Sequence, residues 1–189
     1  MKIRKIAYLS TLFAFLLPTL VVATVVLSYT YPITSTPQNA EIYLTTGPNY
    51  AAASAMSLIT VASIDSVYTP GYIHSGTGIT INTVSGSSQT ALVNVLEIYN
   101  GTGTSFKYPV YVTLYAPSIS GLTMYASTFP LTVTNSTSGI LITGTVVSTG
   151  GTTFHLTASN DAALYIGFLM TGSASGSANF VINYQINSS

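Results

Sequence analysis

Charged residues are almost missing from this sequence. They make up 4% of the 189 residues, whereas ordinary soluble domains contain about 25%. The composition is nevertheless not that of a disordered chain, because 48% of the residues are apolar and can form a core. The remainder is mostly Ser, Thr, Asn and Gly. This composition favours a folded domain whose surface forms hydrogen bonds without carrying charge.

Basic residues are scarce outside the N-terminus. Lys2, Arg4 and Lys5 lie at the start of the chain, and Lys107 is the only later one. If residues 1–23 are removed, the remaining chain contains one basic residue, Lys107, and four acidic residues, so its formal charge is −3. A chain without a basic patch is a poor partner for nucleic acid and for anionic membrane surfaces.

Cysteine is absent, which excludes disulfide bonds and thiolate metal sites. Carboxylates are also few, and acid unfolding works mainly by protonating carboxylates that are paired in the native state. We therefore expect the stability to be nearly the same from neutral to strongly acidic conditions. The side chains concerned are Glu41, Asp65, Glu97 and Asp161.

Residues 1–23 have the pattern of a secretory signal peptide. The basic stretch "MKIRK" precedes the apolar stretch "IAYLSTLFAFLLPTLVVA", and Val21 and Ala23 are suitable residues before a cleavage site. We therefore predict a secreted cell-surface protein that begins at Thr24. It would contact the membrane only through this segment, before cleavage.

Two alternatives remain for the same segment. The apolar run 6–27 is long enough to stay in the membrane as an anchor, which would give a monomeric surface module. It is also a candidate for the helical stalk of a type IV pilin cut near Lys5, although Pro18 and several β-branched residues weaken a long helix. The position of the mature N-terminus distinguishes these three readings.

The first residues of the expected mature chain, "TVVLSYTYPI" (24–33), alternate in hydropathy. A period of two residues predicts a strand with one buried face. The stretch "TSTPQ" follows it, so residues 24–40 read as a strand on a tether. The side chains of the buried face are Val25, Leu27, Tyr29, Tyr31 and Ile33.

A terminal strand on a tether is what donor-strand complementation requires. In that mode, an extended segment of one subunit fills a groove in the incomplete sheet of the next. Because the contact is head-to-tail, its repetition gives an open filament of identical subunits. Pairing within the same chain, with residues 41–46, is the alternative. We expect long strands such as 90–100, 106–116 or 179–186 to border the groove.

Residues 41–189 read as one all-β domain. Short β-type runs follow one another every 10 to 12 residues with Gly, Pro, Ser and Asn between them, which indicates a sandwich or barrel. The run 163–170 is apolar throughout, as in a strand covered on both faces. Only residues 50–62 suggest a short helix, which leads into a strand. The predicted strands are 41–46, 78–84, 90–100, 106–116, 122–127, 129–134, 139–148, 153–158, 163–170 and 179–186.

The sequence offers no convincing catalytic, metal or cofactor site. His74 and His155 have no neighbouring carboxylate in the sequence, so we interpret both as surface residues rather than metal ligands. No nucleophile motif is present. The stretch "GTGTSFK" (101–107) lacks the Gly before Lys of a phosphate-binding loop and no helix follows, so it reads as a hairpin turn. We predict that the protein is not an enzyme.

Three Asn-X-Ser/Thr triplets mark candidate glycosylation sites. Asn100 and Asn135 fall in predicted turns between strands, where a glycan would point into solvent. Asn187 lies third from the end of the sequence. Such triplets also arise by chance in a chain this rich in Ser and Thr.

The secretion segment, the strand-like mature N-terminus and the nearly uncharged β-domain together resemble the subunits of archaeal thread filaments and bundling pili. These belong to a wider group with the camelysin/TasA-like matrix proteins, whose more charged character is absent here. The stretch "ALVNVLEIYNGTGTSFKYPVYVTLYAP" (91–117) is similar to that group's hairpin, in which an apolar strand ends in Asn-Gly-Thr and a second strand returns.

The resemblance implies a jelly-roll-like β-sandwich that is secreted, carries N-glycans and polymerises through N-terminal donor strands. The resulting filament would be an extracellular appendage that serves adhesion or biofilm formation.

Overall fold

The computed structural model describes residues 42–66, 71–84, 88–100, 108–157, 162–172, 174, 176 and 178–186. The expected signal peptide and the expected donor strand with its tether therefore lie outside the described residues. The described part is mostly β-strand with one short helix, which confirms the all-β class.

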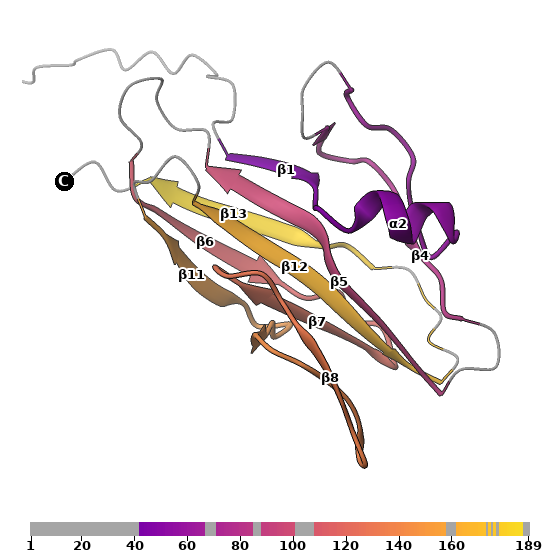
Figure 1. Cartoon of the computed structure of the whole chain (residues 1–189). Coiled ribbons are helices and arrows are strands. Elements are labelled where there is room, and N and C mark those ends of the chain that lie inside the picture. The colour runs from indigo at the N-terminus through magenta and orange to yellow at the C-terminus, as the bar shows by residue number, and fades with distance from the viewer. Residues whose placement is uncertain are drawn as a thin grey trace, which may run out of the picture. The chain divides into compact units, whose positions relative to one another are not determined.

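The largest sheet has six antiparallel strands. A second sheet has three, also antiparallel. Figure 1 shows the three-stranded sheet behind the six-stranded one. The six strands in spatial order are β10 (Thr145–Val146), β7 (Leu122–Ser127), β12 (Ala163–Thr171), β5 (Gln89–Asn100), β1 (Ile42–Thr46) and β3 (Tyr72–Ile73). The three strands are β11 (Thr152–Leu156), β6 (Val110–Tyr115) and β13 (Val181–Ile186).

Two small hairpin-like sheets accompany the larger ones. The first pairs β2 (Ile59–Val61) with β4 (Ile79–Ile81), and the second pairs β8 (Val133–Ser136) with β9 (Gly139–Ile142). The β8–β9 hairpin projects from the body of the sheets (Figure 1).

The six-stranded and three-stranded sheets share one core. Val112 of β6, Leu96 of β5 and Ile166 of β12 are fully buried in the same apolar cluster. Strand β6 shows how the sequence sets this arrangement, because its inward residues alternate with the exposed Tyr111, as a strand with one buried face requires. Strand β12 is buried along nearly its whole length, which confirms the prediction for 163–170.

The only helix among the described residues is α2 (Tyr50–Ala55), which is rich in Ala. Ser57 then adopts a left-handed φ of 57° and the chain enters β2. The Asn82 side-chain amide donates to the Ser57 carbonyl over 2.8 Å, which holds this reversal. The predicted short helix leading into a strand is therefore confirmed.

Several of the predicted strands need correction. The strand expected over 78–84 is confined to β4, Ile79–Ile81, and the one expected over 106–116 begins, among the described residues, only at Val110. The strand expected over 129–134 begins only at Val133, because the backbone of Leu131 is held by a side chain of β5. The strand expected over 139–148 is interrupted at Gly144, whose φ of 139° suits glycine. A Cβ there would lie 2.5 Å from a Leu131 methyl carbon. Strand 153–158 starts and ends slightly earlier, as β11. Strand β3 was not predicted, because its two residues are too few to show an alternating pattern.

The hairpin expected over 91–117 is also wrong. Strand β5 pairs with β1 and β12 in the larger sheet, whereas β6 pairs with β11 and β13 in the smaller one. The chain therefore crosses between sheets after Asn100 instead of returning beside the same strand. Residues 101–107, which make this connection, lie outside the described residues.

Asn94 interrupts β5 with a bulge. Its φ is 55°, and the pairing between β5 and β12 shifts register beside it. The side chain is buried and holds Leu131 at both ends: the Leu131 N–H donates to Oδ1 over 2.7 Å, and Nδ2 donates to the Leu131 carbonyl over 2.9 Å. Opposite the bulge stands Gly167, where a Cβ would lie 2.7 Å from the Leu92 carbonyl oxygen. We call the two hydrogen bonds between the Asn94 side chain and the Leu131 backbone the Asn94 clamp.

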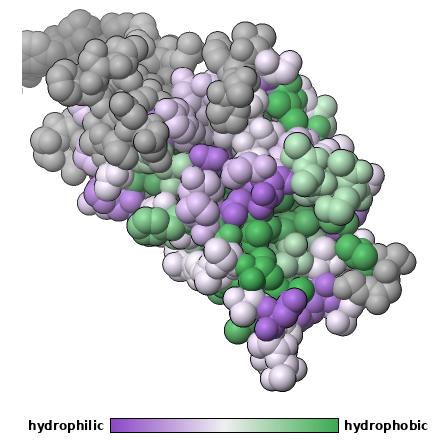
Figure 2. All heavy atoms as spheres, viewed as in Figure 1, coloured by the Kyte–Doolittle hydropathy of each residue, from purple (hydrophilic) through white to green (hydrophobic). Residues whose placement is uncertain are grey.

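The outward face of the six-stranded sheet carries a second, smaller apolar cluster. Leu131, Ile142 and Leu169 form its buried part, with the β8–β9 hairpin as its cover. Figure 2 shows apolar side chains gathered on the face of the molecule from which this hairpin extends. The clamp therefore anchors the segment that leads into the hairpin.

Glu97 lies on the same outward face, between Thr45 of β1 and Tyr165 of β12. Burial raises the pKa of its carboxyl above the ordinary value of 4.5. The described residues include no Lys or Arg that would offset this effect. The folded state thus binds the proton more tightly than the unfolded state, so stability falls as pH rises through the folded pKa.

We therefore expect the melting temperature to rise slightly as the pH is lowered from neutral towards 4.5, rather than stay flat. Glu97→Gln should melt higher than the wild type at pH 7 and should lose this pH dependence. Asp65→Asn is the control and should retain it. Thermal melts followed by circular dichroism between pH 7 and 4 test this; a wild-type melting temperature that falls on acidification contradicts the assignment to Glu97.

Candidate strand-acceptor groove

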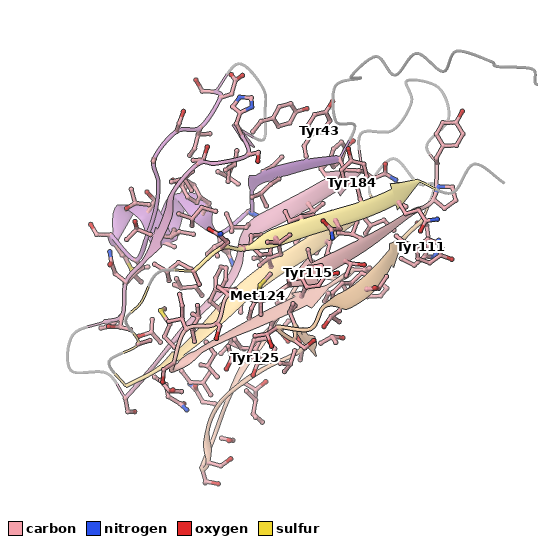
Figure 3. The ribbon with its side chains drawn as sticks, turned by 180° about the vertical axis from the view of Figure 1, so that it is seen from behind. Tyr43, Tyr111, Tyr115, Met124, Tyr125 and Tyr184 are labelled. Atoms are coloured by element: carbon pink, nitrogen blue, oxygen red, sulfur yellow. The ribbon has the colours of Figure 1, made fainter. Side chains whose placement is uncertain are left out.

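A groove of about 1260 Å³ lies along β13. Strand β13 forms one side, and β4 with the turn before it forms the other. The bottom consists of core-facing side chains from the six-stranded sheet. Figure 3, drawn from the side opposite to Figure 1, shows β13 in front of that sheet. The residues of the bottom are Leu96, Ile98, Leu122, Phe168 and Met170.

Strand β13 is an edge strand. It pairs with β6 over its whole length, from Val181 opposite Tyr115 to Ile186 opposite Val110. No other strand among the described residues pairs with its second edge. That edge presents a row of backbone N–H and C=O groups towards the groove, which is a template for one more strand.

The core beside this edge is incompletely covered. The inward residues Val112 and Leu114 of β6 are fully buried. Their partners across the ladder are Tyr184 and Ile182 of β13. Ile182 is only half-buried, and Tyr184 is 44% exposed. The same face of the same sheet is therefore sealed over β6 and only partly covered over β13.

Local sequence explains why the groove stays open. The segment before β13, "GSASGSANF" (172–180), consists largely of small residues, and Ala174, Gly176 and Ala178 line the groove. Small side chains leave the volume above the core unfilled. On the opposite side, Ile79 and Ile81 of β4 are half-buried and line the groove too. Both sides thus offer apolar side chains without filling the space between them.

The groove is nearly free of charge. Besides tyrosines, Asp65 and His74 are the only ionisable residues that line it in the described part of the chain, and His74 Nε2 lies 3.7 Å from an Asp65 carboxylate oxygen. Both side chains reach solvent, His74 with 67% of its surface exposed. His74 is exposed, as predicted, but it has a neighbouring carboxylate in space, because the bridge between Asp65 and Tyr72 brings the two segments together. A groove of this character suits an uncharged, apolar chain.

Tyrosines line one end of the groove. Tyr43 and Tyr72 are stacked with their ring centroids 4.4 Å apart, and the pairing of Tyr43 with Tyr99 and of Tyr72 with Thr45 places both rings on the outward face of the sheet. Tyr184 lines the same groove from β13. Figure 3 labels Tyr43 and Tyr184, which lie near the end where β1 begins and β13 ends.

The three strands expected to border the groove have different roles. Strand β13, within the expected 179–186, does border it, and β5, within 90–100, supplies part of the bottom. The third alternative, 106–116, does not line this groove, because β6 lies on the far side of β13. Sequence reasoning missed β4 and the small-residue segment, although the run of Ala, Gly and Ser before β13 was a usable signal. The five donor-strand residues lie outside the described residues.

Asn100 is not in an exposed turn, contrary to prediction. It is the last residue of β5 and fully buried, and its Nδ2 donates to the Tyr108 carbonyl over 2.9 Å. A glycan is attached through this same nitrogen, so the described conformation leaves no room for one at Asn100. Asn135 lies on β8 and is exposed, as a glycan requires. Asn187 lies outside the described residues.

His155 is exposed on β11, as predicted, and its ring lies 4.8 Å from that of Tyr111. Among the described residues, no three His, Cys, Asp or Glu side chains come together in a way that could hold a metal ion. In the same part of the chain, no helix is long and apolar enough to cross a membrane. Neither protein-family models nor curated proteins give a match to this sequence.

Proposed function

We propose that this protein is the structural subunit of an extracellular filament that assembles by donor-strand complementation. Residues 24–33 of one copy enter the groove of the next copy and pair with the second edge of β13. The domain that accepts them is a jelly-roll-like β-sandwich whose smaller sheet is completed by the incoming strand. The observation that supports this most directly is the edge of β13, which stands beside an incompletely covered core.

The lengths agree. Ten extended residues, such as 24–33, span about 33 Å at roughly 3.3 Å per residue. Strand β13 with the three residues before it, 178–186, spans about 30 Å on the same scale, and residues 178–182 and Tyr184 of this stretch line the groove. A donor of this length therefore covers the open edge from one end to the other.

The chemistry agrees as well. The donor places five apolar or aromatic side chains on one face and has no charged residue. The groove has an apolar bottom, and its described lining carries no charge apart from the Asp65–His74 pair. Backbone hydrogen bonds to β13 would give affinity, and the alternating side chains would enter the groove to give register. The segment would add a strand beside β13 without burying a charge.

The test compares the mature chain 24–189 with a chain that lacks residues 24–33. The shorter chain should stay monomeric by size-exclusion chromatography and should melt at a lower temperature. Adding a synthetic peptide of the sequence TVVLSYTYPI should raise its melting temperature in a saturable way, whereas a peptide of the same composition with the alternation scrambled should not. Polymerisation of the shorter chain would refute the proposal.

A further inference from the structure

The described strands define two ends of the domain. Ile42, at the start of β1, pairs with Asn100, at the end of β5. The Asn100 side chain bonds Tyr108, just before β6, and the start of β6 pairs with Ile186, at the end of β13. We call the end of the domain that holds Ile42, Asn100 and the last residue of β13 the Ile42 end. The opposite end, where β13 begins, is the Val181 end.

A copy's own donor segment leaves its body at the Ile42 end. Between Ile33 and Ile42 there are nine Cα steps, which span at most about 31 Å when fully extended. Wherever the donor segment is inserted, Ile33 must therefore lie within that distance of the Ile42 end of its own body. The direction of the donor strand therefore determines which end of the acceptor domain lies close to the Ile42 end of the donor domain.

A donor that runs parallel to β13 places its Ile33 at the Ile42 end of the acceptor. The Ile42 ends of donor and acceptor then face each other. In this arrangement each copy can insert its segment into the other, which closes a symmetric dimer. A chain's own segment can also reach its own groove in this direction, because Ile33 and Ile42 then lie at the same end. Both outcomes stop growth.

A donor that runs antiparallel to β13 places its Ile33 at the Val181 end of the acceptor. The Ile42 end of the donor's body then follows the Val181 end of the acceptor's body. Every copy is related to the next in the same way, and a free groove remains at one terminus of the assembly. This direction gives an open chain of subunits without bringing the Ile42 ends of two copies together.

Resting on the function proposed above, we propose that the donor strand pairs with β13 in the antiparallel direction. Val25 and Leu27 then lie beside Tyr184, near the Ile42 end, and Ile33 lies at the Val181 end. The antiparallel direction thereby favours a growing filament over the closed dimer that the parallel direction permits.

Engineered cysteine pairs test the direction, and the absence of native cysteine makes every cross-link interpretable. Tyr184→Cys is combined with Val25→Cys or Leu27→Cys in two chains, and with Tyr31→Cys or Ile33→Cys in two others. Inward residues of adjacent strands are close enough for a disulfide. Each chain is assembled under reducing conditions, imaged by electron microscopy, oxidised and run on a denaturing gel.

A ladder of covalent oligomers from the Val25 or Leu27 chains, with little from the Tyr31 or Ile33 chains, is the expected result. A ladder from Tyr31 or Ile33 alone would overturn the antiparallel direction and leave donor-strand complementation standing. Filaments that give no cross-link in any of the four chains would overturn both. Two donor positions for each direction guard against a one-residue error in register or one poorly tolerated substitution.

Discussion

Leu27→Asp is expected to abolish filament assembly, whereas Ser28→Asp is expected to leave it nearly unchanged. In a strand, neighbouring residues face opposite sides, so Leu27 enters the groove and Ser28 faces away. Each fully buried apolar side chain contributes about 1.5–3 kcal/mol relative to exposure. In the proposed filament, Leu27→Asp removes that contribution and also places a carboxylate against the apolar bottom of the groove.

The two variants carry the same added charge at adjacent positions, so each is the control for the other. Assembly is measured by electron microscopy and by the pelleted fraction after ultracentrifugation. Secretion and the mature N-terminus are checked by sequencing, since both positions lie close to the expected cleavage site. Equal behaviour of the two variants would mean that the alternation of 24–33 is not used for insertion.

Asn94→Leu is expected to destabilise the domain by about 3–5 kcal/mol. The substitution removes both bonds of the Asn94 clamp and leaves the Leu131 N–H and carbonyl without their partners. Each unsatisfied buried group costs about 1–3 kcal/mol. A left-handed φ of 55° adds roughly 1–2 kcal/mol for a residue such as Leu. Urea unfolding in the Leu27→Asp background, which keeps the chain monomeric, gives the change in unfolding free energy.

Two further variants separate these contributions. Asn94→Gly accepts the same backbone conformation but lacks the clamp, so its difference from Asn94→Leu isolates the strain. Asn49→Ala removes another side-chain bond near the bulge, to the Val93 carbonyl, at an exposed site. It should therefore cost less than about 1.5 kcal/mol. A loss below 1 kcal/mol for Asn94→Leu would contradict a structural role for the clamp.

The elements that could be predicted from sequence are those whose signal is local. Residues 122–127 were predicted with their exact bounds as β7, and 163–170 lacks only Thr171 of β12. Both runs contain enough apolar residues in a regular pattern to identify a strand without knowing its partners. The helix at 50–55 was recognised from its alanines for the same reason.

Features that depend on distant partners were not predictable in this way. Asn100 reads as a turn residue, yet it is buried because Tyr108 and Ala162 come to it from other elements. Asp65 and His74 are nine positions apart and meet only through a single bridge of the sheet. The groove is the extreme case, because its sides come from β4 and β13 and its bottom from β5, β7 and β12. No single stretch of sequence contains it.

The lengthwise edge of β13 also bears on how such an assembly would respond to tension. The backbone groups of this strand form one straight row alongside the groove. A partner strand that is pulled along its own axis loads all the bonds of such a row together, in shear. Pulling across the axis would instead open them one after another, like a zipper. Because each donor in the proposed filament is tethered at the end of the strand, stretching the filament loads the ladder in the first, stronger geometry. Tensile strength then comes from the orientation of one edge strand and needs no covalent link between subunits.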